Sequence, residues 1–203
     1  DYFPQVHGEV WPHPEQAMPE FSGFAERSLT CRKFVLIGAL SAAKGLHRLI
    51  ELANLSLQSE EPFEFVVVGP TLEPLATALP RNVTVTGQYD QSQLIHLLSR
   101  ERPDGFLFLS VVPETYNYAL SAALATGLPI WALEAGAIGE RLQGVDRATV
   151  LPGDTSAPQL LASIKLVESS YRAKDIQAVA NTSGLPAGEY ISRLVNSTNP
   201  DAA

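Results

Sequence analysis

The 203-residue chain lacks the features that several large classes of function require. It contains one cysteine, Cys31, which excludes an internal disulfide framework and any metal site built from several cysteines, and which fits a reducing compartment. It has no apolar run of about 18 residues and no basic leader before an apolar segment, so it predicts neither a membrane span nor export. Its 14 basic residues are scattered and its formal net charge is −8, which argues against electrostatic binding of nucleic acid.

Two further patterns carry little chemistry. His7, Glu9, His13 and Glu15 are rich in metal-ligating groups, but they share a proline-rich segment that offers no helical spacing to hold them around an ion, so we expect no metal site there. Asn-x-Ser/Thr triplets matter only in a secreted protein, and we interpret those in this chain, such as the ones that begin at Asn82, Asn181 and Asn196, as chance occurrences.

The chain divides by composition into three parts. Residues 1–32 contain four prolines and read as a linker or extension. Residues 33–170 alternate apolar runs with helical patterns, and since 45% of the chain is hydrophobic, they can bury a core. Residues 171–203 are interrupted by Gly184, Pro186 and Gly188 and are predicted to be a helical tail that frays. The chain begins with Asp1 rather than Met, so we expect it to be a piece of a longer protein.

Within residues 33–170 the periodicity predicts five buried strands that alternate with helices. This order is typical of an α/β fold with a doubly wound, Rossmann-like parallel sheet and right-handed crossovers, whereas a barrel of eight such units needs more chain. The expected strands are 34–37, 63–68, 83–85, 106–109 and 128–133. The expected helices are 46–57, a short piece after residue 71, 94–102, a segment ending at 125, and 157–170.

The ends of these strands carry the candidate site. Gly38, Gly69 and Gly87 follow three strands, and glycine there lets a ligand approach the backbone. Glu114 lies in the loop after the fourth strand, at the edge of a parallel sheet where ligands bind. Lys44 precedes a helix N-terminus, where it is either a phosphate ligand or a solvated surface lysine, and its loop matches neither a P-loop nor a dinucleotide fingerprint.

Four of these segments, taken in order and at their spacing, resemble the C-terminal, donor-binding half of retaining glycosyltransferases of the GT-B fold. The resemblance covers about residues 33–155 and is closest to the group 1 class, family 4, and to bacterial enzymes of surface-polysaccharide assembly that carry a PETYSY-like segment. The segments are GALSAAKG (38–45), VVVGPT (66–71), VTGQYD (85–90) and SVVPETYNYALSAALATGLPI (110–130).

The resemblance implies roles for individual residues. Glu114 would be the catalytic-site residue that hydrogen-bonds hydroxyls of the transferred sugar, and Lys44 would pair with the donor diphosphate. Amides near Asn117 and Tyr118 would meet the distal phosphate. The remaining donor-binding positions would line the base pocket or the phosphate loops; they are Gly38, Gly69, Gly87, Gln88 and Tyr89.

The implied reaction moves a sugar from a nucleotide-sugar to an acceptor with retention of the anomeric configuration. Asp-x-Asp does not occur in this chain, so we expect no metal cofactor and a nucleotide-sugar as the donor substrate. The implied partners are this donor and a sugar or lipid-linked acceptor that an N-terminal domain on chain not present here would hold. The implied location is the cytoplasm, with the full-length protein at the inner membrane face.

Two positions depart from the family pattern and leave alternatives open. The family usually has an arginine after the first-strand glycine, where this chain has Ala39, and a second glutamate eight residues after the first, where it has Ala122. In the family that second carboxylate holds the ribose hydroxyls. The chain is therefore a donor-binding domain that is inactive without its N-terminal partner, or a non-catalytic binding or scaffolding domain. An enzyme of another class on this fold, such as a sugar-nucleotide epimerase, has less support because no second acid/base pair stands out.

Overall fold

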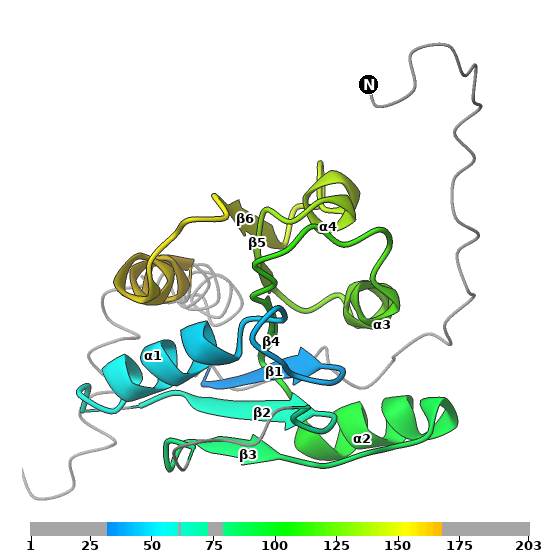
Figure 1. The fold of residues 1–203 in the computed structure, drawn as a ribbon, viewed down its shortest axis with the longest axis horizontal. Helices are drawn as coiled ribbons and strands as arrows, with labels where there is room; N and C mark the ends of the chain where they lie inside the picture. Colours follow the sequence, from blue (N-terminus) through cyan, green and yellow to red (C-terminus); the bar gives the residue numbers. More distant parts are fainter. Residues whose placement is uncertain (1–31, 61, 73–78, 168–203) are drawn as a thin grey trace, which may run out of the picture.

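A computed structural model of the chain describes residues 32–60, 62–72 and 79–167. In these ranges the chain alternates strands and helices (Figure 1). The strands are β1 (Lys33–Ile37), β2 (Glu64–Val68), β3 (Val83–Val85), β4 (Gly105–Phe108), β5 (Ile130–Leu133) and β6 (Ala148–Leu151). The helices are α1 (Leu46–Ser56), the 3-10 turn η1 (Gln91–Gln93), α2 (Leu94–Glu101), α3 (Tyr118–Ala125), α4 (Ala137–Arg141) and a last helix that is described over residues 157–167.

The described strands form one parallel sheet in the order β3-β2-β1-β4-β5-β6. The chain winds outward from β1 to β3, returns to the centre at β4, and then winds the other way to β6. The predicted doubly wound, Rossmann-like sheet is therefore confirmed. In such a sheet ligands bind at the carboxyl edge where the winding direction reverses. Here that place lies at the carboxyl ends of the neighbouring strands β1 and β4.

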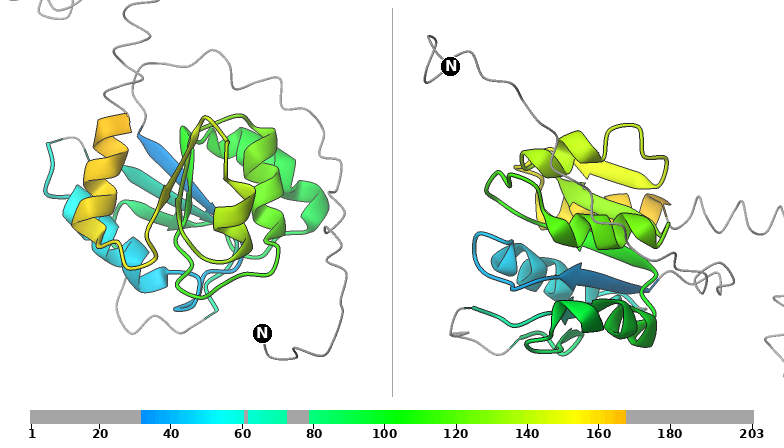
Figure 2. Two further views of the ribbon diagram at one scale, coloured as in Figure 1. Left: turned by 90° about the horizontal axis from the view of Figure 1, so that it is seen from above. Right: turned by 90° about the vertical axis from the view of Figure 1, so that its right-hand side faces the viewer.

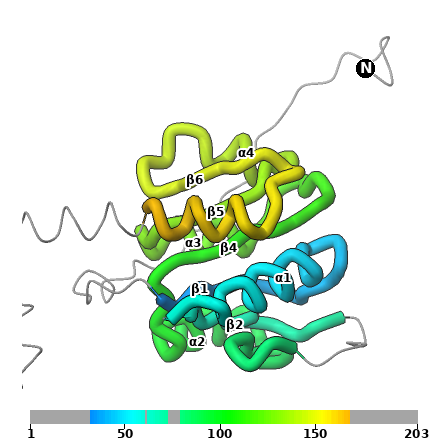
Figure 3. The backbone as a smooth tube through the Cα atoms, turned by 90° about the vertical axis from the view of Figure 1, so that its left-hand side faces the viewer, coloured from blue at the N-terminus to red at the C-terminus, as the bar shows by residue number. Residues whose placement is uncertain are grey.

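Helices cover both faces of the sheet, because successive residues of each strand point to opposite sides. Phe34 and Leu36 of β1 pack with α1 and the 157–167 helix, whereas Val35 packs with α2, α3 and α4. Figure 2 shows α2, α3 and α4 on one side, and Figure 3 shows α1 beside the 157–167 helix on the other. Every residue of β4 and β5 is buried, as expected for central strands covered twice.

The sequence interpretation was wrong in its count of strands and incomplete in its helices. Five strands were expected, but residues 148–151 add β6, whose residues are all partly exposed because it is an edge strand. The five-residue helix α4 was not expected, since it is too short for a periodic apolar pattern and contains Gly139.

The remaining sequence expectations divide into confirmed elements and untested segments. Helix α2 ends before Pro103 as predicted. The extension at 1–32 lies outside the described residues apart from Arg32, and so do residues 168–203 with the predicted tail; most of the short helix after residue 71 is also outside them. The domain limits therefore stay a prediction. None of the helices in the described ranges is long and apolar enough to cross a membrane.

Candidate functional site

The loops after β1 and β4 meet at the carboxyl edge of the sheet and enclose a pocket at the reversal point. Its lining combines the ends of these two strands with side chains from three loops. The lining residues are 36–40 and 107–110, with Lys44, Glu114, Asn117 and Ile138. Four of the predicted site residues, Gly38, Lys44, Glu114 and Asn117, therefore line one pocket although they come from segments up to 79 residues apart, from 38 to 117.

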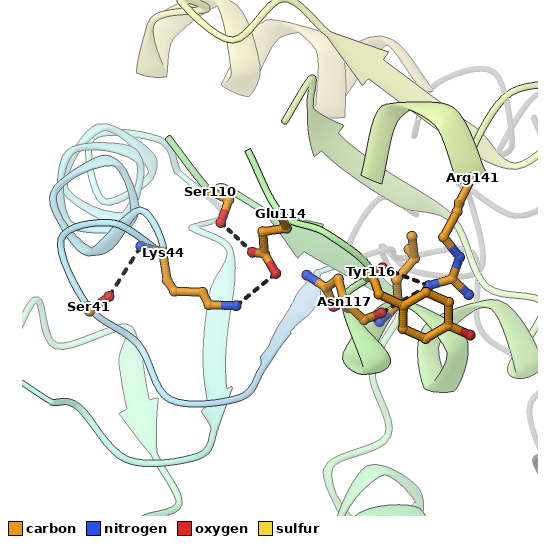
Figure 4. Close-up of polar contacts among 8 residues, drawn as sticks. Ser41, Lys44, Ser110, Glu114, Tyr116, Asn117 and Arg141 are labelled. Atoms are coloured by element: carbon orange, nitrogen blue, oxygen red, sulfur yellow. Dashed lines mark hydrogen bonds and ion pairs between the residues drawn. The ribbon is translucent and has the colours of Figure 1, made fainter. Parts of the chain in front are cut away.

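Lys44 and Glu114 form an ion pair in this pocket. The lysine Nζ lies 2.9 Å from Oε2 of Glu114, and Oε1 of the same carboxylate accepts a hydrogen bond of 2.5 Å from the Ser110 hydroxyl (Figure 4). The lysine side chain is 48% exposed and the glutamate side chain 12%, so a ligand can reach the lysine from solvent while the carboxylate is largely enclosed. Ser110 was not among the predicted residues, and it orients the carboxylate.

Backbone contacts fix both partners of this pair. Lys44 ends a turn in which its amide donates to the Ser41 carbonyl at 3.0 Å, and the amide of Val111 donates to the Ala43 carbonyl at 2.9 Å, which joins this turn to the end of β4. The Glu114 amide donates to the Ala135 carbonyl at 3.3 Å, and its carbonyl accepts from the Ala137 amide at 2.9 Å. The loop of Glu114 is thus held against the β5–α4 connection.

Asn117 forms the start of α3. Its backbone is left-handed, with φ 68° and ψ 86°, and its Oδ1 accepts a hydrogen bond of 3.0 Å from the Leu120 amide, which caps the helix. The helix begins at the next residue, Tyr118, which is 50% exposed. The N-terminus of α3, which carries partial positive charge, therefore adjoins the pocket that holds Lys44.

Arg141 is a second residue that the sequence interpretation missed. It ends α4, and its guanidinium donates hydrogen bonds of 3.0 Å to the carbonyls of both Tyr116 and Asn117 and of 2.8 Å to the Ser121 hydroxyl. It also lies over the Tyr116 ring, with Cζ 4.3 Å from the ring centroid (Figure 4). The sequence pattern around Arg141 could not have identified it as a site residue, because an arginine two residues after a glycine is too common to be informative.

The other predicted donor-binding residues do not line this pocket. Gly69 packs on the carbonyl of Gly38 so tightly that a Cβ at position 69 would lie 2.3 Å from that oxygen. Gly87 lies beside open space, and Gln88 is exposed. Tyr89 packs against the α2–α3 side of the core, and burial raises the pKa of its phenol above the ordinary value of 10.0. A base pocket formed by residues 87–89 stays a prediction.

The two departures from the family pattern have different surroundings. Ala39 lines the pocket, so an arginine there would have reached it. Ala122 is completely buried in the apolar cluster under α3, together with Leu120 and Ala123. A glutamate at position 122 would have to extend its carboxylate out of this apolar cluster to reach a ligand, and this chain has alanine there.

The remaining polar candidates have structural or solvent environments. His47 and His96 are solvent-exposed on α1 and α2. Asn82, which begins one of the glycosylation triplets, donates hydrogen bonds from Nδ2 to the carbonyls of Ala53 and Phe63 at 3.1 and 2.9 Å, so both bonds of this amide nitrogen are made within the fold. No group of three or more His, Cys, Asp or Glu side chains in residues 32–60, 62–72 and 79–167 is arranged to hold a metal ion. The absence of a metal cofactor stays a prediction.

Comparisons with known proteins agree with this geometry. The sequence profile of the family described as glycosyl transferases group 1 matches residues 31–167. No curated protein sequence matches significantly. Among solved structures, the C-terminal domain of the group 1 glycosyl transferase LpcC from Francisella tularensis is 18% identical with a TM-score of 0.55, over 70% of this chain and 78% of that one.

Two further structures are similar over part of their length. HepE of Anabaena in complex with UDP-glucose is 20% identical with a TM-score of 0.52, over 83% of this chain and 49% of that one. WaaG, a glycosyltransferase involved in lipopolysaccharide biosynthesis, is 22% identical with a TM-score of 0.57, over 70% of this chain and 40% of that one. The chain therefore spans about half or less of these two relatives, and at such identities the likeness concerns the fold.

Proposed function

The chain belongs to the group 1 glycosyl transferases, and from that premise we propose that it is the donor-binding domain of a retaining enzyme that transfers a sugar from a nucleotide-sugar. The observation that carries this proposal is the pairing of Lys44 with Glu114 at 2.9 Å. The family pattern assigns one to the donor diphosphate and the other to the sugar, and these are adjacent parts of one donor molecule. The two side chains meet where the sheet reverses its winding.

The charges around the pocket suit a diphosphate. Lys44 supplies a cation that is half-exposed, and the N-terminus of α3 adds partial positive charge on another side of the pocket. A diphosphate competes with Glu114 for the lysine, since both are anions. Once the lysine moves to the phosphate, the carboxylate is free to accept hydrogen bonds from sugar hydroxyls, while Ser110 keeps it oriented.

The chemical step breaks the bond between the anomeric carbon and the diphosphate oxygen, which leaves with both electrons. A new bond forms between that carbon and an acceptor oxygen, whose proton passes to the leaving diphosphate. Negative charge grows on the leaving diphosphate, so fixed positive groups lower the barrier. Lys44 and the α3 amides would supply this stabilisation without a metal, while Glu114 holds the sugar in place.

The wider assignments rest on the relatives. HepE is described in complex with UDP-glucose and WaaG as an enzyme of lipopolysaccharide biosynthesis. By analogy, we infer a UDP-hexose as the first donor to test and a bacterial polysaccharide or glycoconjugate as the product. The acceptor, a sugar or a lipid-linked sugar, would bind a further domain of a longer protein that works in the cytoplasm at the inner membrane face, and the 203-residue chain alone would be inactive.

Calorimetric titration of this chain with UDP, GDP, dTDP and their hexose conjugates tests the proposal. Lys44→Met should weaken every diphosphate ligand that binds by ten- to a hundredfold, because a charge-assisted contact is lost. Glu114→Gln should weaken the nucleotide-sugar and leave the free nucleotide diphosphate equal or tighter, since the carboxylate that competes for Lys44 is removed. The matched control is Lys33→Met, which breaks the ion pair with Glu64 at the opposite edge of the sheet.

Three results would overturn the assignment. The first is that the wild-type chain releases no heat with any ligand at millimolar concentration. The second is that Lys33→Met lowers the affinity for diphosphate ligands as much as Lys44→Met does. The third is that Glu114→Gln weakens binding of the free diphosphate and of its sugar conjugate equally. The third result would place the carboxylate on the phosphate side and contradict the role of Glu114.

The second candidate is a binding or scaffolding domain that has lost its donor site. It is favoured by Ala122, which replaces the expected ribose-holding carboxylate and is fully buried. Under the first proposal Ala122→Glu should tighten nucleotide binding, at a cost in stability of about 1–3 kcal/mol for overpacking. Under the second it should lower stability to the same extent and create no binding.

A further inference from the structure

Arg141 joins three parts of the wall beside the pocket. Its Nη1 bonds the consecutive carbonyls of Tyr116 and Asn117, each at 3.0 Å, and its Nη2 bonds the hydroxyl of Ser121, one turn into α3, at 2.8 Å. Its Cζ also lies over the Tyr116 ring, 4.3 Å from the centroid. The two guanidinium nitrogens span these acceptors, whereas the ammonium of a lysine is a single nitrogen that lies one bond nearer the backbone and cannot reach all three.

These bonds determine where two backbone amides point. Every described peptide bond is trans, so a carbonyl and the amide of the next residue point in opposite directions across one planar unit. The carbonyls of Tyr116 and Asn117 are both directed at Arg141. The N–H groups of Asn117 and Tyr118 are therefore directed away from Arg141.

The backbone at this point needs such support. Asn117 is left-handed, a conformation that residues other than glycine adopt at a cost in free energy. Its side chain accepts a hydrogen bond from the Leu120 amide in the following turn, and Arg141 donates to the carbonyls of Tyr116 and of Asn117 itself. Asn117 also lines the pocket that contains Lys44 and Glu114. The loop from Glu114 to α3 is consequently fixed from both sides.

We infer that Arg141 is a positioning residue for the phosphate end of the donor: it holds the carbonyls of Tyr116 and Asn117 so that the amides of Asn117 and Tyr118 face the diphosphate. The inference rests on the proposed function, because it concerns the same site. Arg141 touches no ligand itself. Its guanidinium lies on the carbonyl side of the loop, where it also adds positive potential to the N-terminus of α3.

The test compares Arg141→Met and Arg141→Lys with Arg147→Met in the 203-residue chain. Arg147 is a matched control, since it donates one guanidinium hydrogen bond of 2.9 Å to the carbonyl of Gly127, just beyond the other end of α3. The probes are UDP and inorganic pyrophosphate, titrated while the backbone amide resonances are followed by NMR. Thermal unfolding of each variant checks that it folds.

In the wild-type chain and in Arg147→Met, both probes should shift the amides of Asn117 and Tyr118 and those near Lys44. In Arg141→Met, affinity should fall about ten- to a hundredfold and the shifts of Asn117 and Tyr118 should vanish, while those near Lys44 remain at saturation. Arg141→Lys should recover the charge but not the two carbonyl bonds, and so only part of the affinity. A general loss of stability would not remove the response at two amides selectively.

The outcomes separate the two levels of the proposal. If the wild-type chain binds neither UDP nor pyrophosphate, the proposed donor site fails and the role of Arg141 fails with it. If the wild-type chain binds and a folded Arg141→Met or Arg141→Lys binds equally well with the same shifts at Asn117 and Tyr118, the donor site stands and the positioning role is overturned.

Discussion

Replacing Gly45 by alanine should both destabilise the domain and separate Lys44 from Glu114. Gly45 precedes α1 with φ 88°, and a Cβ there would lie 2.2 Å from the carbonyl oxygen of Leu109 at the end of β4. Real Cβ atoms do not approach backbone oxygens so closely. The turn that carries Lys44 would therefore have to move away from β4, and Ser110 and Glu114 lie just beyond that strand.

The magnitude follows from two terms. A left-handed backbone costs an alanine about 1–2 kcal/mol, and relieving an overlap with a packed backbone costs about 1–3 kcal/mol more. The control is Gly144→Ala, because Gly144 also has a positive φ, 73°, but a Cβ at this position would meet no other group within 4 Å. It should lose only the first term. The stabilising loss of chain freedom in the unfolded state is shared by both variants and cancels.

Urea unfolding followed by far-UV circular dichroism measures both variants, with the slope of the transition checked for two-state behaviour. The free energy of unfolding of Gly45→Ala should be lower than that of Gly144→Ala by about 1–3 kcal/mol, the cost of overpacking. Gly45→Ala should also weaken UDP binding, whereas Gly144→Ala should not. Equal destabilisation by the two variants would refute the claim that contact with Leu109, rather than backbone conformation, fixes this turn.

Two further predictions concern positions away from the pocket. Asn82→Asp should lower the free energy of unfolding by about 1–3 kcal/mol, because it replaces the Nδ2 donor to the carbonyls of Ala53 and Phe63 by an acceptor that repels them. Urea unfolding measures this loss of stability, and the exposed substitution Gln88→Glu is the control. A loss below about 0.5 kcal/mol would contradict the prediction. Burial raises the pKa of Tyr89, so the folded state holds the phenol proton more tightly than the unfolded state does. The stability that this provides is complete below pH 10.0, the unfolded value, and is lost as the pH rises toward the folded value. Unfolding measured from pH 9 to pH 11.5 should show a shallower decline in Tyr89→Phe than in wild type, and an equal decline in the two proteins would contradict this role of Tyr89.

Part of the candidate site could be predicted because it depends on local chemistry. Glu114 and Lys44 each follow a buried strand and precede a helix, and the carboxyl ends of parallel strands share one edge, so both were expected near the same cleft. Ser110 and Arg141 could not be found in this way. Ser110 is one of many serines, and Arg141 acts on α3 from a helix too short to leave a periodic pattern. Their roles depend on which segments become neighbours after folding.

The sequence by itself determined the fold class and the edge of the sheet where the site lies. Alternating apolar runs and helical patterns can bury their apolar faces together only in a layered α/β structure, and the turn residues mark the strand ends. Tertiary structure alone decided that β1 and β4 are neighbours at the reversal point, that Lys44 reaches Glu114, and that Arg141 fixes the carbonyls of Tyr116 and Asn117. The reason is physical: strand order and hydrogen bonds between distant segments, such as Lys44 and Glu114 70 residues apart, arise from the packing of the whole domain, which no local pattern encodes.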